Sequence, residues 1–319
     1  MLPALGAGDP CSNHGSPTLN LKAVNMEKLI LGSMEDYTDL AFRLLCQKHG
    51  ANLTITEMTS PIAIYRENKK SLERIIIPKQ EKNGYIQLMG TAHKEFFKGV
   101  EKVVEIIETG KNNAKGIDIN FGCPSKKTYK NKSGSYLLKY PKTIKEIIKK
   151  TSKICPYSIS CKLRLGFEKE NEIFNIIKIL NDSELNFAII HGRTRTQGYS
   201  GNANWGILEK ARDTAEFTVY GNGNISSLDQ VKEKFKQGWK GISIARCARG
   251  NPNIFSNKKQ DKKQFLEYLK LAEKFNCLGL KRAKLHAICF EKNKQERIKI
   301  SKIKTIEELL RFSNQHYLS

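Results

Sequence analysis

A cysteine follows a predicted buried strand directly and stands beside a run of lysines. Residues 116–120 alternate like a short strand, and Phe121-Gly122-Cys123-Pro124 ends it abruptly. Proline fixes its own φ and pushes the preceding residue towards extended geometry, so the thiol is held in one place beyond the strand. Four lysines follow, in a predicted loop with Ser133-Gly134-Ser135; they are Lys126, Lys127, Lys130 and Lys132. A fixed thiol beside cations indicates acid/base chemistry on a polyanion, whereas a half-buried structural cysteine is the plainer alternative.

Short apolar strands alternate with helices eight times in residues 28–255. The predicted strands are 28–32, 52–57, 85–89, 116–120, 158–163, 187–191, 217–220 and 241–245. The predicted helices are 39–49 with Thr38 as its cap, 93–108, 141–150, 170–180, 205–212 and 226–237. Eight such units are typical of an α/β fold, the (β/α)8 TIM barrel. Helical patterning without strands continues over 256–319, which we interpret as a small C-terminal helical domain.

Polar residues gather just after the predicted strands, where such barrels place their active sites. They are Ser33 and Met34; Glu57; Gln87 to Gly90; Asn120 and Cys123; Lys162 and Arg164; His191 to Arg195; Asn222 and Gly223; and Arg246. Any one of them has a structural explanation, but packing alone does not account for the whole set. The glycines of Gly221-Asn222-Gly223-Asn224, together with Arg246 at a helix start, predict a phosphate-bearing cofactor after the last two strands.

Charge and cysteine usage restrict the partners and the compartment. The net charge is +23, with 55 Lys and Arg against 32 Asp and Glu, which favours nucleic acid unless it reflects a lysine-rich proteome. Residues 256–319 alone hold 16 basic and 7 acidic residues. The eight cysteines form no Cys-x-x-Cys pair, so we expect no metal and a reducing cytoplasm. No apolar run predicts a membrane span, and residues 1–27 have the composition of a disordered extension.

Several blocks between about Leu31 and Phe255 carry a more specific pattern. They include Glu57-Met-Thr-Ser, Ile86-Gln-Leu-Met-Gly, Asn120-Phe-Gly-Cys-Pro, Lys162-Leu-Arg-Leu-Gly, His191-Gly-Arg-Thr-Arg and Gly221-Asn-Gly-Asn. Together they resemble the tRNA-dihydrouridine synthases, since other flavin barrels do not carry both the Asn-x-Gly-Cys-Pro and the His-Gly-Arg-Thr-Arg block. The chain departs from the family at Tyr136, where alanine is usual, and at Ala245-Arg246-Cys247, where Gly-Arg-Gly is usual.

The resemblance implies an FMN-binding barrel over 28–255 and a basic, helical tRNA-binding domain over 256–319. In the family NADPH reduces FMN, the flavin passes hydride to C6 of a uracil in tRNA, and a cysteine, here Cys123, protonates C5. The implied substrate-binding residues are Asn120, Lys126 and Arg193. The implied cofactor-binding residues are Met34, Gln87, Lys162, His191, Asn222, Gly223, Ala245 and Arg246. We expect a monomer.

Two other functions are compatible with parts of this pattern. One is an FMN-dependent TIM-barrel oxidoreductase acting on a small molecule, against which the basic tail and the lysines after Cys123 argue. The other is a non-catalytic tRNA-binding protein, against which the intact set of Cys123, Lys162 and His191 argues.

Overall fold

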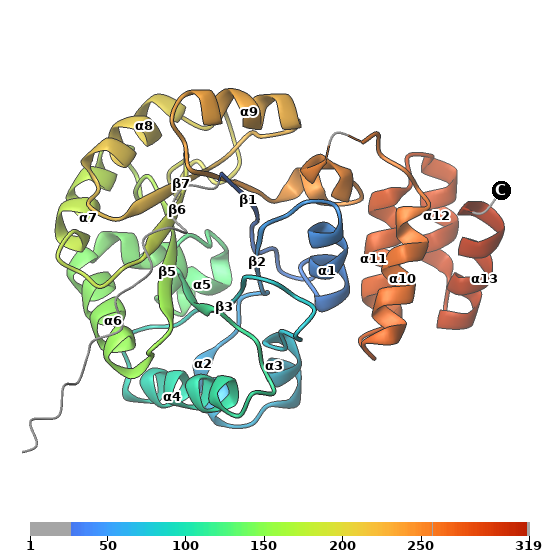
Figure 1. The fold of residues 1–319 in the computed structure, drawn as a ribbon, viewed down its shortest axis with the longest axis horizontal. Helices are drawn as coiled ribbons and strands as arrows, with labels where there is room; N and C mark the ends of the chain where they lie inside the picture. The colour runs from blue at the N-terminus through green and yellow to red at the C-terminus, as the bar shows by residue number, and fades with distance from the viewer. Residues whose placement is uncertain (1–26, 257, 318–319) are drawn as a thin grey trace, which may run out of the picture.

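Eight parallel strands close into a barrel, which Figure 1 shows with its helices around it. The computed structural model describes residues 27–256 and 258–317. The strands are β1 (Lys28–Leu31), β2 (Leu53–Ile55), β3 (Gly84–Leu88), β4 (Gly116–Asn120), β5 (Ser158–Arg164), β6 (Phe187–His191), β7 (Thr218–Asn222) and β8 (Gly241–Ile244). Each strand pairs with the next, and β1 pairs with β8. The predicted TIM barrel is therefore confirmed.

Helices cover the outside of the barrel, except the short α5, which lies in the connection after β4 beside the carboxyl ends of the strands. They are α1 (Leu40–Lys48), α2 (Pro61–Tyr65), α3 (Lys69–Arg74), α4 (Lys94–Glu108), α5 (Lys126–Lys130), α6 (Pro141–Ile154), α7 (Glu172–Leu180), α8 (Trp205–Thr214) and α9 (Leu228–Lys236). The cap of α1 is Asp39, whose carboxylate accepts from Phe42 N at 3.0 Å, so the prediction of Thr38 as the cap is wrong. The Thr38 hydroxyl instead bonds both backbone groups of Met34, each at 3.0 Å, which fixes the loop after β1.

The lysine run after Cys123 is partly helical rather than a loop. Ser125 caps α5 by accepting a hydrogen bond from Thr128 N at 3.2 Å, an arrangement that serine favours at helix starts. A 3-10 helix, η2 (Gly134–Lys139), follows and leads into α6. The segment between Cys123 and α6 is therefore ordered by its own hydrogen bonds.

Aromatic side chains fill the barrel interior towards the amino ends of the strands. Ring centroids of Tyr85 and Phe187 lie 5.2 Å apart, and those of Phe187 and Tyr220 lie 5.1 Å apart. Gly116 and Gly241 make room for them, because a Cβ would come within 2.7 Å of Tyr85 Cε1 at the first and 2.4 Å of Tyr220 Cδ1 at the second. Nearer the carboxyl ends, the strands carry buried polar side chains, among them Gln87, Asp118 and Ser160, and barrels of this kind place their active sites at that end.

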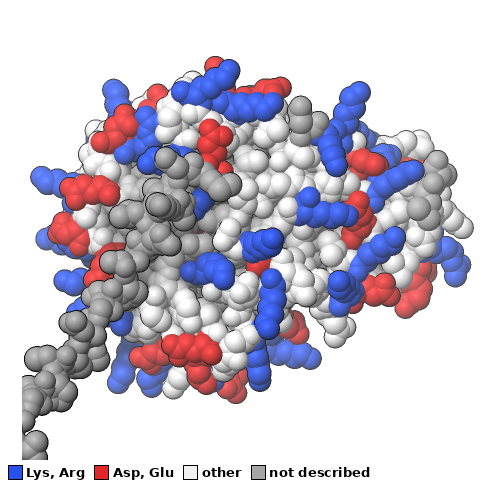
Figure 2. Space-filling view, viewed as in Figure 1, with Lys and Arg blue, Asp and Glu red and all other residues white. Residues whose placement is uncertain are grey.

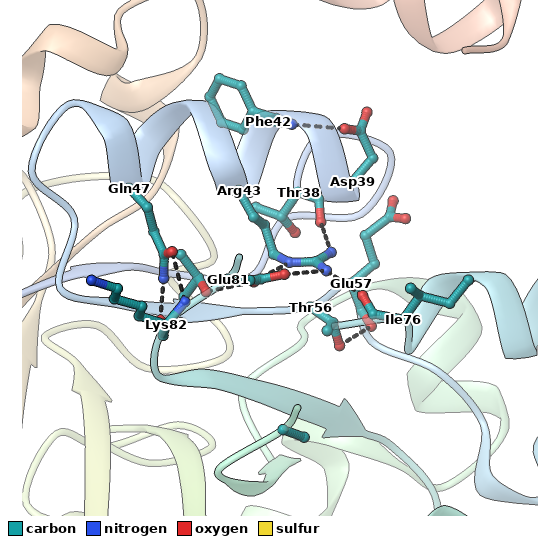
Figure 3. Close-up of polar contacts among 12 residues, drawn as sticks. Thr38, Asp39, Phe42, Arg43, Gln47, Thr56, Glu57, Ile76, Glu81 and Lys82 are labelled. Atoms are coloured by element: carbon teal, nitrogen blue, oxygen red, sulfur yellow. Dashed lines mark hydrogen bonds and ion pairs between the residues drawn. The ribbon is translucent and has the colours of Figure 1, made fainter. Parts of the chain in front are cut away.

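A buried ion pair fixes α1 to the neighbouring strands (Figure 3). Arg43 Nε and Nη2 donate to the Glu81 carboxylate at 2.7 and 2.9 Å, and both side chains are buried. Thr54 of β2 donates to the same carboxylate at 2.6 Å. Two further N–H groups of the Arg43 guanidinium donate to the carbonyl oxygens of Thr38 and Ile76. Because every partner is hydrogen-bonded, the pair can be tolerated in the interior.

Four helices form the C-terminal region, which lies beside α1 in Figure 1. They are α10 (Gln264–Lys274), α11 (Leu280–Phe290), α12 (Lys294–Lys302) and α13 (Ile306–Tyr317). Buried Asp39 accepts from Tyr268 of α10 at 3.0 Å and contacts Nε2 of His286 of α11 at 3.1 Å. Burial opposes ionisation of Asp39, but His286, the Phe42 N–H and Arg282 together outweigh it and hold the pKa of that carboxyl below its usual value. The helical character of residues 258–317 agrees with the sequence, whereas a separate domain stays a prediction.

Basic side chains lie over both the barrel and the C-terminal helices, with acidic side chains interspersed (Figure 2). Among the residues that the structure describes, no helix is both long and apolar enough to cross a membrane. The predicted disordered extension, 1–27, lies outside the described residues except for Glu27.

Candidate active site

A cavity of about 850 Å³ opens at the carboxyl ends of the strands, within the size range of small-molecule sites. Of the catalytic, substrate-binding and cofactor-binding residues that the resemblance implies, all line it except Gln87, Lys126 and Arg193. In the wider set of strand-end residues, Glu57, residues 88–90, Gly192, Thr194 and Arg195 do not line it either. Loops after widely separated strands meet there, including those that carry Met34, Cys123 and Arg246. A smaller hollow of about 510 Å³ lies between α3 and the end of α4, away from the strand ends.

The three predicted residues outside the lining have other surroundings. Gln87 is fully buried below the cavity. Arg193 is buried, donating to the carbonyl oxygens of Ser200 at 3.1 Å and Gly201 at 2.5 Å. Lys126 is exposed on α5, beside the opening. Direct contact of these residues with a substrate or cofactor stays a prediction.

A chain of buried hydrogen bonds sets the direction of the Asn120 amide. Asp118 accepts from Ser160 Oγ and from Gln87 Nε2, both at 2.7 Å. An ionised carboxylate only accepts, so the Gln87 amide must turn its oxygen to Asn120 Nδ2, 2.9 Å away. Asn120 Oδ1 then accepts from the backbone N–H of Cys123 at 2.9 Å. Strand register brings these side chains together, because Asp118 pairs with Gln87 on one side and Ser160 on the other.

The Cys123 thiol is held by its backbone rather than by a side-chain partner. Its carbonyl oxygen accepts from Ser135 Oγ at 2.7 Å, Ser135 N at 3.1 Å and Thr128 Oγ1 at 3.1 Å. The side chain is partly exposed and lines the cavity. The thiol therefore has a fixed position and an open side, which a proton donor to a bound substrate needs.

Four cationic residues surround His191: Lys162, Arg164, Arg193 and Arg246. Burial and the positive charges hold the pKa of His191 far below its usual value, so the ring is neutral. Arg193 Nη1 lies 3.0 Å from His191 Nε2. A guanidinium cannot accept a hydrogen bond, so Nε2 accepts and the ring proton lies on Nδ1.

These cations have little negative charge to neutralise them. Burial, followed by the charge of Arg164, lowers the pKa of Lys162 to about 8. Burial also lowers the pKa of Arg164 to about 10. Within residues 27–256 and 258–317, neither Lys162 nor Arg246 has a carboxylate within ion-pair distance. A cavity lined in this way favours an anionic ligand.

The strand ends of β7 and β8 add polar groups to the same side of the cavity. Lys162 Nζ donates to Asn222 Oδ1 at 3.1 Å, and Asn222 Nδ2 donates to the Ser243 carbonyl at 2.7 Å. The buried Ser243 hydroxyl has no partner within the described structure. Gly223 has φ +135°, and a Cβ there would meet Ala203 Cβ at 2.5 Å. Only glycine fits this turn, because its φ is positive and Ala203 fills the space that a side chain would need.

Sequence reasoning missed several residues of this arrangement. Asp118 lies within a strand that is buried throughout, and an acidic residue in such a strand is itself a signal of a polar partner. Arg164, noted only as a strand-end residue, donates to the Gly122 carbonyl at 2.7 Å and joins the loops after β4 and β6. Tyr199 lines the cavity, with Arg246 Cζ 4.5 Å from its ring centroid. Arg282 of α11 binds Glu57 at 2.6 Å, a contact that no local pattern indicates.

Comparison with known proteins identifies the family. Residues 30–315 match the dihydrouridine synthase family (Dus). The chain is 32% identical over 237 residues to the "Probable tRNA-dihydrouridine synthase" of Aquifex aeolicus, covering 73% of each protein. It is 32% identical over 230 residues to tRNA-dihydrouridine synthase B of Vibrio vulnificus, covering 72% of this chain and 70% of that protein. The chain therefore belongs to the dihydrouridine synthase family, a class of FMN-dependent oxidoreductases.

A solved structure of morphinone reductase overlaps less closely. It covers 75% of this chain and 85% of its own, with a TM-score of 0.48 and 10% sequence identity. That likeness is too slight to bear on function.

In the part of the chain that the structure describes, no group of three or more His, Cys, Asp or Glu side chains is placed to hold a metal ion.

Proposed function

We propose that this protein reduces the C5=C6 bond of uridines in tRNA, with FMN as its flavin and NADPH as its reductant. The supporting observation is the cavity, because the partly exposed Cys123 thiol lines the same opening as His191 and three of its four cationic neighbours, Lys162, Arg164 and Arg246. The small-molecule alternative needs the same flavin but no tRNA, so tRNA dependence separates the two.

The residues present fit FMN. Arg246 and the glycine turn at Gly223 line the cavity together and suit a single phosphate, and the unpartnered Ser243 hydroxyl offers one further hydrogen bond. Lys162 is a cationic donor and the Nδ1–H of His191 a neutral donor, and both suit the polar edge of the flavin ring system. FMN, when bound, supplies the chemistry of hydride transfer.

The chain's own residues would bind the uracil and handle the proton. Asn120 presents an amide of fixed direction, because the Asp118–Gln87 pair orients it. Adding hydride at C6 leaves negative charge to be relieved at C5, and the Cys123 S–H is the proton donor that we assign to that carbon. The thiol proton passes to C5, the sulfur is left as thiolate, and solvent returns the proton.

The compartment that we propose is the cytoplasm. All seven cysteines within the described residues are free thiols, including partly exposed Cys123 and exposed Cys247. Free thiols at such sites persist in a reducing environment, where tRNA is also available.

The two half-reactions of a Cys123→Ala variant test this function. NADPH should reduce its flavin at the normal rate, because that step needs no proton for the uracil. Reoxidation of the flavin by tRNA should slow by about two to four orders of magnitude, the usual contribution of a placed general acid. Stopped-flow absorbance of the flavin measures both steps.

Cys247→Ala is the matched control, since Cys247 lines the same cavity on the loop after β8. It should leave both half-reactions unchanged. Normal reoxidation by tRNA in Cys123→Ala would refute the catalytic role of the thiol. A wild-type protein that takes up no FMN would refute the cofactor assignment, and reoxidation by small enones but not by tRNA would support the alternative.

A further inference from the structure

Three tyrosines form a contiguous, largely exposed aromatic surface beside the cavity. Tyr129 lies on α5, Tyr136 on η2 and Tyr140 directly after η2. Their ring centroids follow one another at 5.3 Å, from Tyr129 to Tyr136, and 5.5 Å, from Tyr136 to Tyr140. Tyr129 is 42% exposed and Tyr140 48%, so both rings present a face or edge to solvent. Water-exposed aromatic clusters of this kind are unusual unless they bind something.

Cations accompany these rings. Arg195 Cζ lies 4.8 Å from the ring centroid of Tyr129 and 5.1 Å from that of Phe167. Lys139 Nζ lies 4.0 Å from the ring of Phe167. The exposed lysines of the same segment are Lys126, Lys127, Lys130 and Lys132. Two acidic residues follow β5 near these rings, and both have hydrogen-bond donors. Glu170 accepts from the Asn204 amide, and Glu172 accepts from the backbone N–H of Phe167. Exposed Glu168 is the acidic residue left beside the surface.

The surface is tied directly to the proposed proton donor. Ser135, the residue before Tyr136, donates both its N–H and its hydroxyl to the Cys123 carbonyl. Thr128, the residue before Tyr129, donates its hydroxyl to the same carbonyl at 3.1 Å. Arg195 belongs to the loop that follows His191, and Phe167 to the loop that follows β5. The rings therefore stand at the rim of the cavity, on the same barrel face as Cys123.

We propose that Tyr129, Tyr136 and Tyr140, together with Arg195 and Lys139, form a stacking platform for unpaired tRNA bases next to the uridine that enters the cavity. Every base has a π-face, so aromatic rings bind single strands with little sequence preference, and the lysines attract the phosphates between the bases. A uridine can reach a barrel mouth only after leaving its stack, which also frees its neighbours to stack elsewhere. This inference rests on the proposed function.

The test uses the FMN-loaded full chain with Tyr129→Leu, Tyr140→Leu and their double variant. Each stacked base contributes about 5- to 150-fold in affinity, so the double variant should raise the Kd for unmodified tRNA at least fivefold. Tyr129→Phe should bind as the wild type does, because stacking needs the ring and not the hydroxyl. Tyr65→Leu is the matched control, since Tyr65 is 40% exposed, has Lys98 Nζ 5.2 Å from its ring and lies at the end of α2, outside the segment that joins Cys123 to α6.

A second readout does not depend on activity. A short single-stranded RNA with 2-aminopurine next to a uridine should lose fluorescence on binding the wild type, and this quenching should disappear in the double leucine variant. The platform is refuted if the double variant binds tRNA as tightly as Tyr65→Leu and quenches normally, since the rings would then pack only against each other and Arg195. If wild-type protein reduces no uridine in tRNA, the proposed function fails, and the quenching experiment still decides on the platform.

Discussion

Replacing Asp118 by asparagine removes a buried charge while keeping the shape of the side chain. Burial raises the pKa of Asp118 to about 6 from its ordinary 3.8, against the opposing hydrogen bonds of Gln87 and Ser160. The asparagine oxygen can still accept from Gln87 Nε2, and its nitrogen can donate to Ser160 Oγ, because a hydroxyl also accepts. The orientation of Gln87 and Asn120 should therefore persist.

The pKa shift fixes both the sign and the size of the effect. Between pH 3.8 and 6 the folded protein holds a proton on Asp118 that the unfolded chain has lost, so the stability of the wild type falls as pH rises through this window. At 1.36 kcal/mol for each pKa unit, the ionised carboxylate destabilises the fold by about 3 kcal/mol above pH 7. Asp118→Asn should then be more stable than the wild type by about 3 kcal/mol at pH 7.5, and by only about 1.5 kcal/mol at pH 5.

Urea unfolding at pH 5, 6 and 7.5 measures this difference, with the m-value as a check that the same transition is observed. Asp182→Asn is the control, because Asp182 is exposed and pairs with Lys145 at the surface. It should change stability by less than about 1 kcal/mol, with no gain as pH rises. A difference between Asp118→Asn and the wild type that stays constant over the three pH values would refute the assignment of a buried, ionisable Asp118.

Two further predictions concern the buried ion pairs of the fold. Arg43→Met leaves the Glu81 carboxylate buried without its partner and should destabilise the protein by about 3–5 kcal/mol in urea unfolding. Adding Glu81→Gln should restore part of that loss. If the double variant loses the sum of the two single losses, the two residues are not coupled and the prediction is wrong. Burial opposes ionisation of Glu291, but hydrogen bonds from Asn293 N, Lys262 and His316 lower its pKa to about 2. The ionised carboxylate therefore stabilises the folded protein above pH 4.5, and this stabilisation is lost as pH falls towards 2. Glu291→Gln should therefore be less stable than the wild type at pH 7, by up to about 3 kcal/mol, and nearly equal to it at pH 2.5 in thermal unfolding; an equal deficit at both pH values would contradict this.

Local sequence patterns determined the architecture and the place of the chemistry. The alternation of apolar strands with amphipathic helices predicts eight βα units, and a parallel barrel is the arrangement that buries them all. It also places Cys123, Lys162 and His191 near the carboxyl ends of predicted strands, at the end of the barrel where active sites lie. The short-range signals were less reliable at caps, since Thr38 and Asp39 are both good capping residues and only the path of the loop after β1 chooses between them.

The tertiary structure alone decided which of these residues act together. The contacts from Ser160 through Asp118 and Gln87 to Asn120 depend on the register between three strands, which no single strand encodes. The loops and strand ends that converge around His191 bring together four cations, and in the described part of the chain neither Lys162 nor Arg246 has a carboxylate within ion-pair distance. Arg282 reaches Glu57 from a helix 225 residues away. Periodicity reports which face of an element is buried, but pairing across strands and loops is set by barrel closure, and that is a property of the whole chain.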